Sequence, residues 1–98
     1  MVRKISWNER ALDKFGKVTN YLLESWSANI ADEFVEKALK DIDSLLEFPY
    51  IGRESEKNDS YRCLLITKHN LLIYRIEKKK IVIVNIVDTR QKSKRINY

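Results

Sequence analysis

The 98-residue sequence contains little that would cross-link, break or loosen a chain. It has one cysteine, which excludes an internal disulfide, and one cysteine with one histidine cannot supply the four ligands of a usual zinc site. Only one proline and two glycines occur, and 44% of the residues are hydrophobic, which argues against disorder and low complexity. We therefore expect a folded protein that carries no metal and no cofactor.

Long apolar runs are also missing. The longest runs span only a few residues, such as 71–74 and 81–84, and are far shorter than the roughly 20 residues needed to cross a bilayer. Residues 1–10 are charged at both ends and have no apolar centre, unlike a secretory signal. The sequence thus predicts a cytoplasmic protein that does not enter a membrane, and its length allows a single domain over residues 1–98.

Negative charge is scarce in the second part of the chain. Residues 61–98 hold 10 Lys and Arg against 2 Asp and Glu, a net charge of +8. Residues 1–60 hold 9 against 12, a net charge of −3, so the whole chain reaches +5. This asymmetry indicates a face built for an acidic partner, either a nucleic acid or an acidic protein segment.

Helical periodicity dominates the first part of the chain. After a short strand predicted over residues 2–7, apolar residues recur at helical spacing and predict a helix over about residues 9–26, with Asn8 as its cap. A polar break at Ser25–Asn29 separates it from a second amphipathic helix, predicted over about residues 31–46. Because the break is short, we expect the two helices to form an antiparallel hairpin.

The pattern changes to strands after the Phe48–Gly52 segment, where proline and glycine end the second helix. Residues 53–60 are polar and predict a loop. Three strands are then predicted over residues 61–67, 71–77 and 80–87, and their short connections imply antiparallel neighbours. The resulting order, β-α-α-β-β-β, predicts an α+β fold with the helical hairpin packed on one face of a mainly antiparallel twisted sheet.

Several local motifs accompany this order of elements. They are Ile5-Ser6-Trp7 followed by Ala11; Leu45 through Phe48-Pro49 to Gly52; Tyr61-Arg62 leading through His69 to Ile73-Tyr74-Arg75; and Asp88-Thr89-Arg90-Gln91. Together they resemble the RelE/ParE toxin superfamily, and the last motif resembles its ParE-like side. The resemblance implies the toxin of a type II toxin–antitoxin system, a growth inhibitor neutralised by a cognate antitoxin that wraps a helix or strand across it.

The resemblance leaves two activities open, because RelE-like members cut messenger RNA in the ribosome without metal, whereas ParE-like members poison DNA gyrase. RelE-like enzymes place cationic residues at alternating positions on one strand, on the next strand and near the end of the last. Arg62 and Arg90 correspond to the first and last of these positions. Leu64 and Leu71 stand near the other two and cannot bind phosphate. The missing cations favour the ParE-like, noncatalytic alternative.

RNA cleavage without metal needs a base, an acid and cations that stabilise the phosphate. If the protein is an endonuclease, the candidate catalytic residues are Arg62, His69, Arg90 and Tyr98. An exposed turn histidine, a frayed terminus and an ion pair between Arg90 and Asp88 are the alternative interpretations. The candidate partner-binding or target-binding residues are Arg62, Arg75, Arg90, Lys92, Lys94, Arg95 and Trp26.

A third class, a nucleic-acid-binding module without toxicity, is disfavoured. Such modules commonly display stacking aromatics and glycine-rich loops, which this sequence lacks. The remaining conspicuous residues have structural interpretations. Cys63 and Trp7 are expected in the core, and Lys78–Lys80 is expected to form a solvated hairpin tip.

Overall fold

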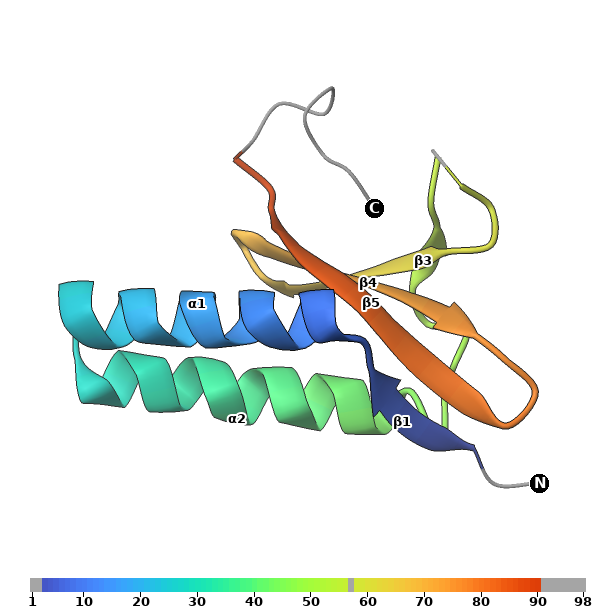
Figure 1. Cartoon of the computed structure of the whole chain (residues 1–98), viewed down its shortest axis with the longest axis horizontal. Helices are drawn as coiled ribbons and strands as arrows, with labels where there is room; N and C mark the ends of the chain where they lie inside the picture. Colours follow the sequence, from blue (N-terminus) through green and yellow to red (C-terminus); the bar gives the residue numbers. More distant parts are fainter. Residues whose placement is uncertain (1–2, 57, 91–98) are drawn as a thin grey trace.

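The computed structural model describes residues 3–56 and 58–90. Five strands form one sheet, and an antiparallel pair of helices covers one of its faces (Figure 1). The elements are β1 (Lys4–Trp7), α1 (Glu9–Ser25), α2 (Ala28–Ser44), β2 (Arg53–Glu54), β3 (Arg62–Thr67), β4 (Asn70–Ile76) and β5 (Lys80–Asp88). The predicted α+β class and helical hairpin are confirmed. Neither described helix is long and apolar enough to span a membrane.

Side-chain caps set where both helices begin. The Asn8 side chain accepts a hydrogen bond from the backbone N–H of Ala11 at 2.9 Å, which satisfies one of the donors left open at the start of α1. The Ser27 hydroxyl accepts in the same way from the N–H of Ile30 at 3.1 Å. Because Ser27 caps α2, this helix begins at Ala28, three residues earlier than its apolar periodicity predicts.

The sheet has the strand order β1-β5-β4-β3-β2, so β5 lies inside it and β1 and β2 form its edges. β1 runs parallel to β5, and the other neighbours are antiparallel. β5 has one residue more than β4 between the Ile73–Asn85 and Tyr74–Ile83 partners, which is a bulge at Val84. The edge strand β2 falls in the segment predicted as a loop, since two polar residues carry no alternating pattern.

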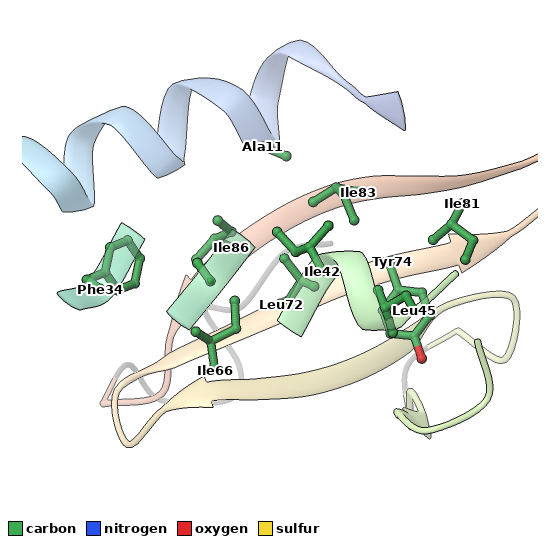
Figure 2. Close-up of a cluster of buried hydrophobic side chains, with 11 residues drawn as sticks. Ala11, Phe34, Ile42, Leu45, Ile66, Leu72, Tyr74, Ile81, Ile83 and Ile86 are labelled. Atoms are coloured by element: carbon green, nitrogen blue, oxygen red, sulfur yellow. The ribbon is translucent and has the colours of Figure 1, made fainter. Parts of the chain in front are cut away.

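Apolar side chains are buried on both faces of the sheet. The larger cluster lies between sheet and helices, where Phe34 and Ile42 of α2 and Leu45 directly after it pack over the strands (Figure 2). The strands contribute Ile66, Leu72, Tyr74, Ile81, Ile83 and Ile86 to it. The smaller cluster occupies the opposite face and consists of Cys63, Ile73, Val82, Val84 and Val87. The predicted burial of Cys63 is thereby confirmed, and Trp7 packs against Phe15 with 5.3 Å between ring centroids.

Candidate partner-binding groove

A groove of about 710 Å³ lies where α1 and the start of α2 meet the first residue of β4 and the last residues of β5. Its apolar lining combines buried residues of β5 with partly exposed residues of the helices: Val18, Tyr21, Leu22, Trp26, Ile30, Ile86 and Val87. Its polar lining consists of Lys14, Lys17, His69, Asn70, Asp88 and Arg90. With His69 neutral, three cations and one carboxylate give this lining a net charge of +2.

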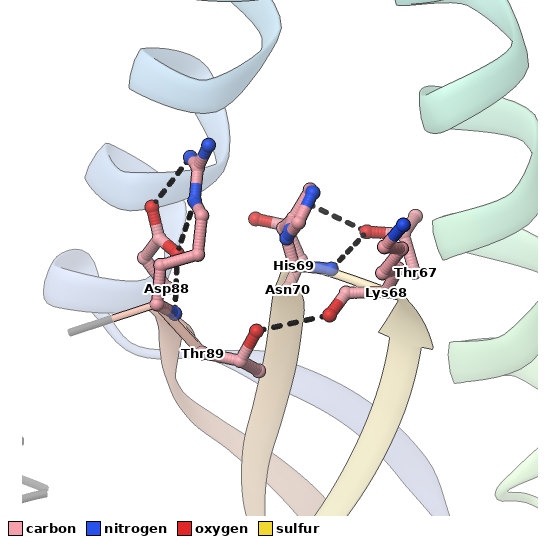
Figure 3. Close-up of polar contacts among 7 residues, drawn as sticks. Thr67, Lys68, His69, Asn70, Asp88 and Thr89 are labelled. Atoms are coloured by element: carbon pink, nitrogen blue, oxygen red, sulfur yellow. Dashed lines mark hydrogen bonds and ion pairs between the residues drawn. The ribbon is translucent and has the colours of Figure 1, made fainter. Parts of the chain in front are cut away.

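The end of β5 is held in a fixed shape beside this groove (Figure 3). The guanidinium of Arg90 donates to both carboxylate oxygens of Asp88, at 3.0 Å and 2.8 Å, and the backbone N–H of Arg90 donates to one of them at 2.9 Å. Chiefly because of the side-chain bond to Arg90, the pKa of Asp88 is lowered to about 2. The same pair raises the pKa of Arg90. Arg90 therefore forms the ion pair with Asp88 that was one of its two interpretations from the sequence.

The turn between β3 and β4 is bonded to this strand end. Thr89 donates its backbone N–H to the carbonyl of His69 at 3.0 Å and its hydroxyl to the carbonyl of Lys68 at 2.9 Å. Within the turn, the hydroxyl oxygen of Thr67 accepts from the amide of Asn70 at 2.8 Å (Figure 3). These bonds hold His69, which is half-buried, against the groove. Trp26 lies on the helical side and is 65% exposed.

Arg62 lies elsewhere, under the segment that follows α2. Its Nε donates to the carbonyl of Gly52 at 2.8 Å, and its guanidinium stands 5.1 Å from the centre of the Tyr50 ring. Arg62 pairs in register with Tyr74, whereas Asp88 pairs with Asn70, four residues away along β4, or about 13 Å. The structure therefore does not bring Arg62 to the groove that Arg90 lines.

Arg75 is separated from both of these arginines. It follows Tyr74 on β4, and because side chains alternate along a strand it lies on the sheet face opposite to Arg62. Its Nε donates to a carboxylate oxygen of Glu77 at 2.7 Å. Arg62 and Arg75 thus form no common cationic face. The other predicted residues, Lys92, Lys94, Arg95 and Tyr98, lie outside the described residues.

Sequence reasoning missed the helical wall of the groove. Lys14, Lys17 and Tyr21 recur at helical spacing along one side of α1, next to Val18 and Leu22 of the stripe that packs on the sheet. The two lysines are typical of a solvated helix face, so among these residues only the aromatic Tyr21 could have indicated a groove.

Among residues 3–56 and 58–90, no cluster of His, Cys, Asp and Glu is arranged to hold a metal ion.

Residues 5–93 match the family described as the ParE toxin of type II toxin–antitoxin system, parDE. The chain belongs to this ParE toxin family. The match includes all four motifs singled out in the sequence, from Ile5 to Gln91, and Asp88 and Arg90 of the last motif line the groove. The RelE/ParE resemblance inferred from the sequence is confirmed.

Several solved structures have a fold similar to that of this chain. A protein of the chromosomal ParDE system from P. aeruginosa superposes with a TM-score of 0.76 at 18% identity, covering 89% of this chain and 96% of that one. A YoeB/ParE toxin from Agrobacterium tumefaciens reaches 0.64 at 15% identity, covering 87% and 96%. The E. coli DinJ–YafQ toxin–antitoxin complex contains a chain that reaches 0.63 at 12% identity, covering 90% and 93%. No protein of curated function matches the ParE-family chain in sequence. These low identities establish the fold alone.

Proposed function

We propose that this ParE-family toxin arrests growth by binding a protein target, DNA gyrase, rather than by cutting RNA. The observation that carries the proposal is the separation of the three described arginines that were candidates for binding phosphate or a target. An RNA endonuclease without metal needs several cations around one phosphate, because they stabilise the negative charge that develops there. In the part of the chain that the structure describes, Arg62, Arg75 and Arg90 lie at separate places and each has a protein partner.

The positions where a RelE-like enzyme carries its other cations support the same proposal. Leu64 packs toward the helices and Leu71 packs with the apolar cluster on the opposite face. Around Leu71 that opposite face is formed by Cys63, Ile73 and valines, which are apolar and do not replace the missing cation. A noncatalytic inhibitor needs no such donors.

We assign the groove to the cognate antitoxin. The proteins of similar fold from P. aeruginosa and E. coli are described as members of toxin–antitoxin pairs, which supports a partner of this kind. An apolar lining with a net charge of +2 fits an antitoxin helix that presents apolar side chains flanked by Asp and Glu. The apolar contacts supply affinity, and the opposite charges increase the rate of association.

Induced expression of the chain alone in bacteria tests the target. Growth arrest with chromosomal breaks and a DNA-damage response is the expected result, and purified gyrase should accumulate cleaved DNA when the protein is added. Growth arrest with transcript cleavage and intact chromosomes would overturn the proposal in favour of an endonuclease.

One observation favours the endonuclease alternative: His69 and Arg90 line the same groove as Lys14 and Lys17. An endonuclease that uses them should lose toxicity in the double variant His69→Gln with Arg90→Gln. A gyrase inhibitor should keep its toxicity in this variant. Far-UV circular dichroism of the purified variant checks that the fold is unchanged.

The assignment of the groove is tested by truncating its aromatic side chains. The double variant Tyr21→Ala with Trp26→Ala should bind the purified antitoxin at least about tenfold more weakly, because aromatic anchors often contribute 2 kcal/mol or more each to an interface, which is roughly a factor of 30. Leu12→Ala with Leu39→Ala is the matched control, since these exposed residues lie outside the groove lining. Equal affinities of the two double variants for the antitoxin would contradict the assignment of the groove to the antitoxin.

A further inference from the structure

The segment that follows α2 presents a patch of large apolar side chains to solvent. We call residues 46–52 the aromatic loop. Phe48, Tyr50 and Ile51 are 59%, 65% and 59% exposed, and Leu46 beside them is also exposed. Single exposed apolar residues need no explanation, but neighbouring ones on one short loop often mark an interaction surface.

The backbone of the aromatic loop is held by two side chains from beneath. The hydroxyl of Tyr74 donates to the carbonyl of Pro49 at 2.7 Å and accepts from the N–H of Gly52 at 3.0 Å. Arg62 donates to the carbonyl of Gly52 at 2.8 Å and supports the Tyr50 ring by a cation–π contact. Figure 2 shows Tyr74 beside Leu45, the residue that follows α2. Because Arg62 and Tyr74 are register partners on β3 and β4, the sheet itself fixes the loop.

This support has a consequence for binding. A loop already held in one conformation loses little conformational entropy when a partner immobilises it, so more of its contact energy becomes affinity. Aromatic residues on a rigid support are the usual anchors of protein interfaces. The aromatic loop therefore combines exposed anchors with a preorganised backbone.

The charge around the loop narrows the choice of partner. Residues 43–56 contain four acidic residues and one basic residue, a net charge of −3, and Arg62 beneath the loop brings this to −2. The acidic residues are exposed: Asp43, Glu47, Glu54 and Glu56. Negative charge repels the phosphates of RNA and DNA and complements a protein surface bordered by Lys and Arg.

Resting on the proposed function, we infer that the aromatic loop is the surface by which this toxin engages its protein target, inserting Phe48, Tyr50 and Ile51 into an apolar site with a basic border. The surface is separate from the groove. Ile30, which lines the groove, and Ser44, where α2 ends, are fourteen residues apart, or about 21 Å of helix. None of residues 46–52 lines the groove, so target and antitoxin would contact different residues of the chain.

The experiment compares two triple variants with the unaltered chain. Phe48→Ala with Tyr50→Ala and Ile51→Ala removes the loop anchors, and Leu12→Ala with Leu23→Ala and Leu39→Ala removes three exposed leucines from the helices. The loop variant should cause no growth arrest and should bind purified DNA gyrase at least about tenfold more weakly. The helix variant should match the unaltered chain in both measurements. Unfolding midpoints and soluble protein levels confirm that the variants are folded and expressed.

A single charge reversal adds a second readout. Glu47→Lys should slow association with gyrase about three- to tenfold, whereas Glu33→Lys on the exposed side of α2 should leave it unchanged. Full toxicity in a folded loop variant would overturn the inference while leaving the proposed function standing. Absence of arrest by the unaltered chain, or arrest through RNA cleavage, would remove the proposed function and this inference together.

Discussion

Tyr74 shows how one polar atom in an apolar core can organise a loop. The strand pattern predicts a core position there, but it does not distinguish tyrosine from phenylalanine, because the carbonyl that its hydroxyl contacts lies 25 residues away. Burial raises the pKa of Tyr74, and the hydrogen bond from Gly52 opposes the rise only in part. The folded protein therefore holds this phenol in its protonated form.

Tyr74→Phe should destabilise the protein by about 1–3 kcal/mol, since it leaves the carbonyl of Pro49 and the N–H of Gly52 without their partner. Urea unfolding followed by circular dichroism measures this difference. Because the folded pKa is raised above the unfolded value of 10.0, the contribution is complete below about pH 10 and is lost as the pH rises through the folded pKa. The stability difference between the two proteins should thus be constant from pH 6 to 9 and shrink above pH 10; a constant difference up to pH 11 would contradict this.

The Asp88–Arg90 pair offers a second test on single residues. Its two partners are two residues apart in a recognisable motif, so an ion pair was predictable as one of two alternatives. In a carboxyl-detected NMR titration, Asp88 should titrate at about 2, and Arg90→Gln should move the midpoint toward 3.8. With a lowered folded pKa, the pair stabilises the protein above about pH 4, and this contribution is lost as the pH falls toward 2. An unchanged midpoint in Arg90→Gln would assign the shift to another cause.

At the scale of elements, replacing each of the two glycines by alanine should change the stability of the protein in opposite directions. A Cβ on Gly52 would stand 2.6 Å from the Tyr74 hydroxyl and 2.8 Å from the carbonyl of Cys63, so Gly52→Ala should destabilise the protein by about 1–3 kcal/mol. A Cβ on Gly16 meets nothing within 4 Å, and in the exposed middle of α1 Gly16→Ala should stabilise it by about 0.5–1 kcal/mol. Thermal unfolding of both variants checks the pair, and a stabilising Gly52→Ala would mean that the aromatic loop is not held as described.

The elements themselves were largely predictable because their signals are local. Apolar spacing, the Asn8 cap and the proline after α2 lie within the segments that they define. Ser27 was part of the predicted break, but the shift of α2 to Ala28 needed the hydrogen bond itself. β2 was missed because its two residues form a strand only through their pairing with Cys63 and Arg62.

At the scale of the molecule, the groove escaped prediction because it joins parts of four elements. Trp26, His69 and Arg90 were each singled out, yet their proximity depends on the register of β4 with β5 and on the packing of α1 against β5. Arg62 was grouped with Arg90 from the motifs of the family, and the register separates them. Short-range patterns thus predict the elements, whereas the sites depend on side chains that meet only after folding.

Because the groove and the aromatic loop carry opposite charges, the effect of salt on association rates tests whether a charged surface docks its partner. The groove and the antitoxin are the pair to measure. The groove lining carries +2 and residues 43–56 carry −3, so each surface attracts a partner of the other sign. At about 0.15 M salt the screening length is about 8 Å, which still allows charges to guide the approach of a partner. Raising the salt concentration should therefore slow association of the antitoxin far more than it speeds dissociation, as measured by stopped-flow tryptophan fluorescence. Lys14→Glu with Lys17→Glu, which gives the lining a net charge of −2, should abolish or reverse the effect of salt on association. If salt instead acted mainly on dissociation, charges within the formed complex would hold the antitoxin, and the cationic groove would not be a docking surface that accelerates its approach.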